Sequence, residues 1–108
     1  MITLVILSIF NYNRIKFEYF VWDLSSENEI KREQAAEEII KMGDIAIPYL
    51  INKLDKQFIF ETDYVVYCLE EITHANTYNR DKADFYKEVI PFWKQWWKVN
   101  SYKFKNYF

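Results

Sequence analysis

The sequence predicts an all-α protein, folded as a single domain of helical hairpins, and three observations support this prediction. The 108 residues include one Gly and two Pro, too few turn residues for a β-sandwich or barrel, which favours long helices with few joints. Apolar side chains recur at i, i+3, i+4 and i+7 along several segments. Hydrophobic residues make up 51% of the chain, so it can bury a core without disulfides or metal ions.

Residues 1–25 are expected to supply an N-terminal helix that covers the rest of the fold. They begin with an apolar run, Met1–Phe10, that is similar to the core of a signal peptide but lacks a basic segment before it and a small-residue cleavage site after it. A run of about ten residues is also too short to cross a bilayer, which takes about 20. We therefore expect no membrane span and a cytoplasmic location. For residues 1–13 a helix, a signal remnant and a segment left by an uncertain start site are the alternatives.

Residues 26–56 are predicted to form a first pair of helices. Ser26-Glu27-Asn28-Glu29 is a capping box, in which the Ser hydroxyl and the Glu carboxylate bind free amides at a helix start, so a helix should begin there. Gly43 should end this helix, and Asp44 should cap a second helix whose first turn admits Pro48. The apolar positions with helical spacing are Ala35, Ala36, Ile39, Ile40 and Met42 in the first helix and Ile47, Leu50, Ile51 and Leu54 in the second.

Residues 61–98 are predicted to form a second pair of helices that closes the fold, followed by a tail at residues 99–108. The residues His74–Arg80 are expected to form the loop between these two helices. Because Pro91 lies inside the last helix, we expect either a kink near Lys87 or a separate helix that starts around Ile90. The apolar positions with helical spacing are Val65, Cys68, Leu69 and Ile72 in one helix and Phe85, Val89, Phe92, Trp93 and Trp96 in the other.

The segment Lys31–Leu50 resembles a HEAT repeat: an Arg precedes paired small residues in the first helix, a Gly-Asp turn follows, and an apolar-Pro-x-Leu sequence opens the second helix. Ile47-Pro48 is echoed by Ile90-Pro91, a separation of 43 residues (91 minus 48), within the period of about 40–47 residues of armadillo and HEAT units. The end of the chain resembles small bacterial HEAT-repeat proteins, in which a Leu-x-x-Ile-Thr-Gly segment precedes a Trp-x-x-Trp-Trp helix. The matching segments here are Leu69–Thr73 and Trp93–Trp97, and His74 stands where Gly is usual.

This resemblance implies a short right-handed α-α superhelix with about two HEAT-like hairpins and an N-terminal helix. HEAT proteins are mostly scaffolds and adaptors, so the resemblance also implies a protein–protein interaction module that is not an enzyme and needs no cofactor. In such a module the second helices of the repeats, with Tyr49, Asn52, Lys53 and Tyr86, would line a shallow groove for a protein or peptide.

The closing end of the stack is expected to be capped by Trp93, Trp96 and Trp97, since large rings cover an end that has no further repeat. The chain holds little more than two repeats, whereas about three are needed to build a stable stack. An uncapped end would expose an apolar patch, so a homo-oligomer is a further expectation.

The charge balance argues against a nucleic-acid partner. The chain carries 14 Lys plus Arg against 16 Asp plus Glu, whereas nucleic-acid binders neutralise phosphates with Lys and Arg. Only residues 98–108 are basic with interleaved aromatics, and a terminus whose aromatics pack on the last helix explains them more simply. The alternatives to an adaptor are a nucleic-acid-binding protein that resembles the HEAT-like alkylpurine DNA glycosylases, or a module associated with a HEAT-like lyase.

No residue pattern indicates catalysis or a metal site. Glu71-Ile72-Thr73-His74 matches the Glu-x-x-His motif of di-iron bundles, but that site needs two such motifs and the chain has one His. Cys68 lies on an apolar stripe and is expected in the core. A Cys-His nucleophile with His74 is not expected, because the two residues are six positions apart, on roughly opposite sides of a helix, and no oxyanion donor is apparent. We expect a solvated face or an attraction for a basic partner at the acidic residues, which are Asp55, Glu61, Asp63, Glu70 and Glu71.

Overall fold

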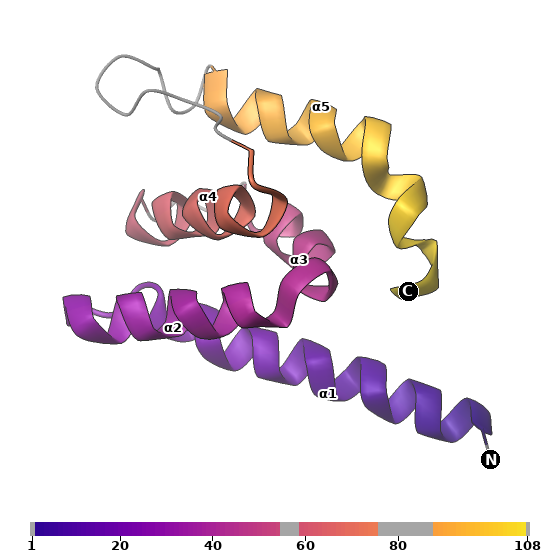
Figure 1. Ribbon diagram of the computed structural model, residues 1–108. Coiled ribbons are helices and arrows are strands. Elements are labelled where there is room, and N and C mark those ends of the chain that lie inside the picture. The colour runs from indigo at the N-terminus through magenta and orange to yellow at the C-terminus, as the bar shows by residue number, and fades with distance from the viewer. Residues whose placement is uncertain (1, 55–58, 76–87, 108) are drawn as a thin grey trace.

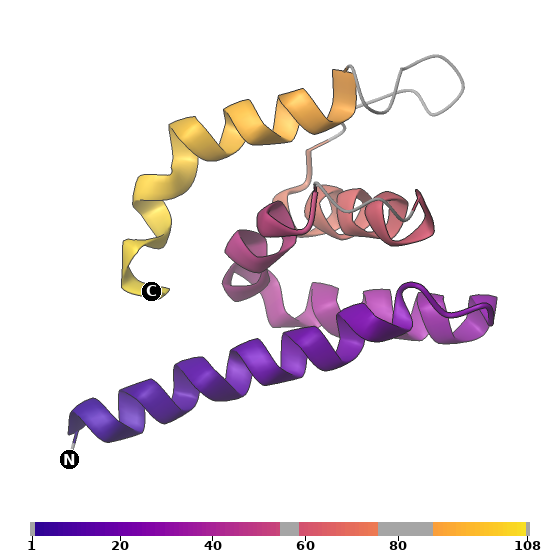
Figure 2. The same cartoon turned by 180° about the vertical axis from the view of Figure 1, so that it is seen from behind.

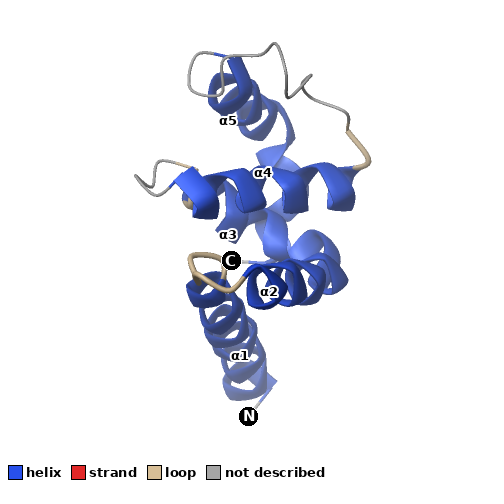
Figure 3. Cartoon of the chain, turned by 90° about the vertical axis from the view of Figure 1, so that its left-hand side faces the viewer, coloured by secondary structure: helices blue, strands red, loops and turns tan. Residues whose placement is uncertain are grey.

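The chain is mostly helical in the part that the computed structural model describes, which comprises residues 2–54, 59–75 and 88–107 (Figure 1). The α-helices are α1 (Ile2–Asp23), α2 (Glu29–Met42), α3 (Ala46–Asn52), α4 (Ile59–Thr73) and α5 (Ile90–Asn100). Two 3-10 helices, η1 (Gly43–Ile45) and η3 (Ser101–Tyr107), complete the described elements. These ranges contain no strand, which confirms the predicted all-α class (Figure 3).

The helices are arranged with α1 at one edge and α5 at the opposite edge (Figures 1 and 3). Helix α2 packs against α1 on one side and α4 on the other, while α3 packs on α4 and also contacts α1 and α5. The first part of α1 extends past the end of α2, as Figures 1 and 2 both show. The prediction of an N-terminal helix over residues 1–25 therefore corresponds to one continuous helix, packed on the two helices of the first pair.

The apolar stripes expected from helical spacing form the core. Ala35, Ala36 and Ile39 of α2 are buried, and so are Ile47 and Leu50 of α3. In the second half of the chain the buried residues at predicted positions are Val65, Cys68, Leu69, Val89 and Trp93. Phe17 and Val21 of α1, and Leu24 in the turn after it, also belong to this core, which the periodicity did not identify.

Among the predicted core residues that the structure describes, Phe92 is the exception, because it is 43% exposed. Helix α5 directs the next residue, Trp93, into the core instead. The buried residues of α5 are Ile90 and Trp93, and Phe92 lies about 200° around the helix from Ile90, on the side away from the core. The prediction that Phe92 is a core position was wrong.

The start of α2 lies two residues later than the capping box predicted. Asn28 is the N-cap, and its side-chain Oδ1 accepts hydrogen bonds from the backbone N–H of Ile30 at 2.9 Å and of Lys31 at 3.3 Å. The Ser26 hydroxyl accepts a bond from the Asn28 N–H at 3.1 Å, which makes a turn before the helix rather than a cap. Asn caps a helix about as well as Ser, and the turn at Ser26 leaves Asn28 in the capping position.

Gly43 ends α2, as predicted, with φ 67° and ψ −143°. The next residues form the short helix η1, so Asp44 lies inside η1 rather than at the start of α3. Ile45 occupies the N-cap position of α3, and no side chain caps this helix. The prediction that Asp44 caps α3 was therefore wrong, because α2 runs into α3 through η1 without a break that a side chain could cap. Pro48 does lie in the first turn of α3, as predicted.

Helix α5 begins at Ile90 with Pro91 in its first turn, and Glu88 and Val89 directly before it form a π-helical turn, so the described residues leave both alternatives for Pro91 open. The expected kink near Lys87, together with Phe85 and most of the predicted loop, lies outside the described residues. The start of that loop, His74, has a φ of 59°, the positive value that Gly adopts easily, in agreement with the resemblance to sequences with Gly there. The tail continues as helix, and its Phe104 is buried.

Candidate functional site

Two of the residues predicted to bind a partner, Tyr49 and Lys53, contact α1. The Tyr49 ring stacks on Phe17 with centroids 5.3 Å apart, and Lys53 Nζ forms a 3.0 Å salt bridge with Glu18 Oε2. Asn52 is exposed beside them, and Tyr86 lies outside the described residues. Helix α1 thus occupies the side of α3 where the sequence predicted a groove, and partner binding by these four residues stays a prediction.

The tryptophans predicted as a cap lie together at the end formed by α5 and η3. Trp93 is fully buried, and its ring meets Trp96 edge-on at 5.7 Å. Trp96 and Trp97 are half-buried, and both rings pack against Phe104 of η3, with centroids 6.2 and 5.5 Å apart. Phe104 of the basic tail therefore packs on the last helix, as the simpler explanation of the tail predicted, whereas Tyr102 of the tail is 63% exposed.

Cys68 is a core residue whose thiol cannot act as a nucleophile near neutral pH. Burial, and secondly the negative charge of Glu71, raise its pKa from 9.0 to about 12. Its Sγ donates a hydrogen bond to the backbone carbonyl of Ala36 at 3.7 Å, which joins α4 to α2. A nucleophilic cysteine needs a lowered pKa and access to solvent, so Cys68 has the properties of a structural cysteine.

A surface groove of about 440 Å³ lies between α2 and α4, and the residues that line it come from both helices. Helix α2 contributes Glu33, Ala36 and Glu37, and helix α4 contributes Asp63, Tyr64 and Tyr67. We refer to this feature as the acidic tyrosine groove. Helix α2 packs on α4, where the Ala36 carbonyl accepts the hydrogen bond from Cys68, and the small, buried side chain of Ala36 leaves room for the groove between the longer side chains around it.

The acidic tyrosine groove combines negative charge with aromatic surface. Glu33 and Glu37 are exposed and lie one helical turn apart on α2, so both carboxylates face solvent on the same side. Asp63 adds a third carboxylate from α4, while Tyr64 and Tyr67 are half-buried against the core. Such a lining favours ligands that are cationic and that can also cover an aromatic ring.

One cation of the chain already sits at the edge of this groove. The guanidinium carbon of Arg32 lies 5.9 Å from the centroid of the Tyr64 ring, within the distance of a cation–π interaction. Arg32 Nη1 also donates a 2.6 Å hydrogen bond to the backbone carbonyl of Ser26, which holds the guanidinium in place. A guanidinium of the chain itself therefore already contacts the Tyr64 ring.

Sequence reasoning did not identify the groove, although part of the signal was present. Asp63 belonged to the acidic group for which a basic partner was one expectation. Glu33 and Glu37 are also four residues apart and on the polar side of a predicted helix. Nothing in the sequence indicated that the polar edge of α2 would lie beside Asp63 and Tyr67, about 30 residues further along the chain.

A second groove of about 440 Å³ lies between α1 and α2 and has a mixed lining. Its charged residues include Lys31 as well as carboxylates, so it lacks the uniform sign of the acidic tyrosine groove. The lining residues are Tyr19, Phe20, Asp23, Lys31, Gln34, Ala35, Glu37 and Glu38.

Among the described side chains, no group of three or more His, Cys, Asp or Glu is close enough to hold a metal ion. The carboxylates of the acidic tyrosine groove are thus spread along two helices, an arrangement that suits separate contacts to basic side chains better than coordination of one ion. Within residues 2–54, 59–75 and 88–107, no helix combines the length and the apolar character that a membrane span requires.

Comparisons of the chain with protein-family models, curated proteins and solved structures found no match.

Proposed function

We propose that the protein is a non-catalytic protein–protein interaction module of the HEAT-repeat type that binds a basic peptide segment of its partner. The observation that carries this proposal is the acidic tyrosine groove, with carboxylates from two helices around two tyrosine rings. Its volume falls within the range of about 300–1,000 Å³ typical of ligand sites. An Arg side chain entering it would find carboxylates for its N–H groups and a ring face for its planar surface.

The HEAT-like architecture is part of the proposal and is supported by the way the helices pack. In a helical-repeat stack the first helices of successive repeats lie side by side, and so do the second helices. Here α2 packs on α4, and α3 contacts α5. The Gly43 turn and Pro48 in the first turn of α3 also have the places that the HEAT resemblance implies. The right-handed superhelix and the cytoplasmic location expected from the sequence belong to this proposal as well.

Peptide titration tests the groove directly. The probe is a synthetic octapeptide of alternating Arg and Ala, with a second octapeptide in which Gln replaces each Arg, both titrated by isothermal calorimetry. Binding of the Arg peptide alone is the expected result. Amide NMR shifts are expected to concentrate in residues 33–37 and 63–67, since both helices line the groove.

The matched variants remove the same charge inside and outside the groove. Glu33→Gln with Glu37→Gln should weaken binding of the Arg peptide by about two- to thirtyfold, because each exposed ion pair contributes about 0.2–1 kcal/mol and 1.4 kcal/mol is tenfold in affinity. Glu27→Gln with Glu88→Gln, at exposed residues outside the groove, should leave the affinity unchanged. Equal weakening by both pairs would mean that net charge, not the groove, holds the peptide.

The charge of the groove also distinguishes this proposal from the nucleic-acid alternative. Phosphates would be repelled by Glu33, Glu37 and Asp63, so labelled duplex DNA should not bind even at low salt. Binding of DNA under those conditions would contradict the proposal, and no feature of the described residues favours the lyase-associated alternative.

A further inference from the structure

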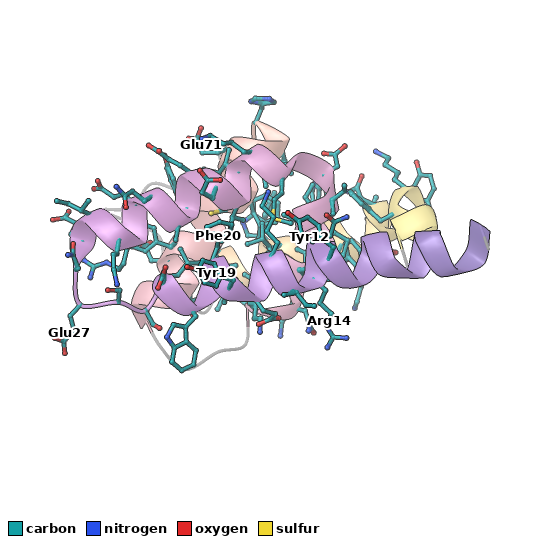
Figure 4. The ribbon with its side chains drawn as sticks, turned by 90° about the horizontal axis from the view of Figure 1, so that it is seen from below. Tyr12, Arg14, Tyr19, Phe20, Glu27 and Glu71 are labelled. Atoms are coloured by element: carbon teal, nitrogen blue, oxygen red, sulfur yellow. The ribbon has the colours of Figure 1, made fainter. Side chains whose placement is uncertain are left out.

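Helix α1 carries a stripe of large apolar side chains on its outer face. Tyr12, Ile15, Tyr19 and Trp22 are 65–82% exposed, whereas Phe17 and Val21 on the opposite face are buried. We refer to these four exposed residues as the α1 stripe. Figure 4 looks at α1 from its outer side and shows Tyr12 and Tyr19 along the helix, with Arg14 on one edge and Phe20 on the edge toward α2. Because soluble monomers rarely expose contiguous apolar patches of this kind, such a patch marks an interface.

We propose that the α1 stripe is a homodimer interface, in which α1 of one copy packs antiparallel on α1 of a second copy. The stripe residues are separated by three, four and three positions, which is the a–d–a–d spacing of a coiled-coil seam. This order of intervals is the same when read in either direction. An antiparallel partner therefore places Tyr12 opposite Trp22 and Ile15 opposite Tyr19, around a two-fold axis at residue 17.

A second copy is the occupant that this symmetry favours. A two-fold interface uses the same patch on both partners, so the patch must complement itself when the chain direction is reversed. The α1 stripe meets this condition in spacing, and it pairs an aromatic ring with Ile15 or with another ring in each layer. Helix α1 also lies at the edge of the molecule, so neither α4 nor α5 stands in front of its outer face (Figures 1 and 3).

The area available agrees with a weak dimer. Aromatic side chains bury about 150–250 Å² each when fully covered. At the exposures given above, the α1 stripe offers on the order of 500 Å² per copy and about 1,000 Å² in a pair, near the lower limit of a specific interface. We therefore expect dissociation in the micromolar range rather than an obligate dimer.

The charges near the two-fold axis give the dimer a distinctive salt dependence. Glu18 is neutralised within its own copy by Lys53, at 3.0 Å. Lys16 lies one residue from the axis and therefore comes close to Lys16 of the second copy. Salt screens this repulsion, so the dimer should become stronger as the ionic strength rises.

Sedimentation equilibrium on the full chain tests the proposal. Between about 1 µM and 1 mM the mass should rise from 13.3 kDa toward twice that value, with a larger dimer fraction at higher salt. Ile15→Glu should weaken dimerisation at least tenfold without changing the helical circular dichroism spectrum, because Ile15 is 69% exposed. Ile30→Glu is the matched control at a 65% exposed position outside the stripe, and it should dimerise like the original chain.

Cross-linking tests the antiparallel order. A mixture of the Ile15→Cys and Tyr19→Cys proteins should form intermolecular disulfides faster than either protein alone, since these positions are opposite each other only in the antiparallel pair. Three results would overturn the proposal: a monomer at every concentration, an Ile15→Glu variant that still dimerises, or faster cross-linking within the Ile15→Cys protein alone. A monomer that binds vesicles of phosphatidylcholine with phosphatidylglycerol through the α1 stripe would also overturn it, in favour of a lipid surface. None of these outcomes bears on the acidic tyrosine groove, so the two proposals can fail separately.

Discussion

Replacing Gly43 by Ala should destabilise the protein through backbone conformation alone. The φ of 67° and ψ of −143° at this joint lie close to a region of backbone space that is almost exclusive to glycine. A Cβ placed on Gly43 would meet no heavy atom within 4 Å, so no clash with neighbours adds to the cost. The strain is about 1–3 kcal/mol, and the reduced entropy of the unfolded chain offsets about 0.4–1 kcal/mol of it.

The resulting net loss of about 0.5–2.5 kcal/mol in the free energy of unfolding is measurable in urea. Unfolding followed by circular dichroism should show a lower midpoint with an unchanged m-value, since the folded and unfolded states keep their compactness. Heating should show a lower Tm, by roughly 4–8 °C for each kcal/mol in a domain of about 100 residues.

Two control variants separate the backbone effect from other causes. Gly43→Asn should cost about as much as Gly43→Ala, because Asn tolerates the left-handed helical region but not a ψ near −143°. Asp44→Ala should change stability by less than about 0.5 kcal/mol, because Asp44 is exposed and does not cap α3. An Ala variant as stable as the original chain would refute the positive φ at this joint. If the Gly43→Asn variant were as stable as the original chain, the ψ of residue 43 would have to be left-handed helical, and α2 and α3 would meet at a different angle.

Substitutions at three further positions have expected outcomes. Trp93→Ala should cost about 3–5 kcal/mol of unfolding free energy, because it leaves a cavity in the core. Trp93→Phe should cost far less. The Nε1–H of the buried Trp93 ring meets no acceptor among the described residues, and removing an unpaired donor recovers about 1–3 kcal/mol. If urea unfolding showed the same loss of unfolding free energy for Trp93→Ala and Trp93→Phe, this would count against an unpaired Nε1–H donor at Trp93. His74→Gly should stabilise by up to about 1 kcal/mol, since φ is 59° there, and a lower urea midpoint would contradict this. The pKa of Cys68 is raised to about 12 in the folded protein. Between pH 9 and 12 the unfolded chain therefore loses a thiol proton that the folded chain keeps. The contribution of Cys68 to the free energy of unfolding should fall by about 1.4 kcal/mol per pH unit over this range. Cys68→Ala should therefore show a shallower decline over that window, and equal slopes for the two proteins would exclude the shift.

The faces of the helices followed from the sequence, while the exact helix starts did not. Ala35, Ile39 and Leu50 are buried as their spacing predicted, since apolar residues at helical intervals must leave water on one side. The start of α2 depended on a choice between Ser26 and Asn28, both of which are good caps. Two hydrogen bonds to Ser26 favour Asn28 as the cap. The Ser26 hydroxyl accepts one from the Asn28 N–H, and the Ser26 carbonyl accepts one from Arg32.

The candidate sites needed information that helical spacing does not contain. Tyr49 and Lys53 were predicted on an open face, and in the structure they contact Phe17 and Glu18 of α1. Spacing indicates which side of α3 is polar, but it does not indicate which neighbouring helix covers that side. The same holds for the acidic tyrosine groove, whose two halves are on separate helices.

Local chemistry in the chain thus accounts for the all-α class, the buried faces and the joint at Gly43, because each depends on residues within a few turns of one another. Other features depend on contacts between segments far apart in the chain. These features are the side of α3 that α1 covers, the pairing of α2 with α4 and the outward direction of the α1 stripe. These contacts are selected by the total apolar surface that the packed helices remove from water, a quantity that no single segment specifies.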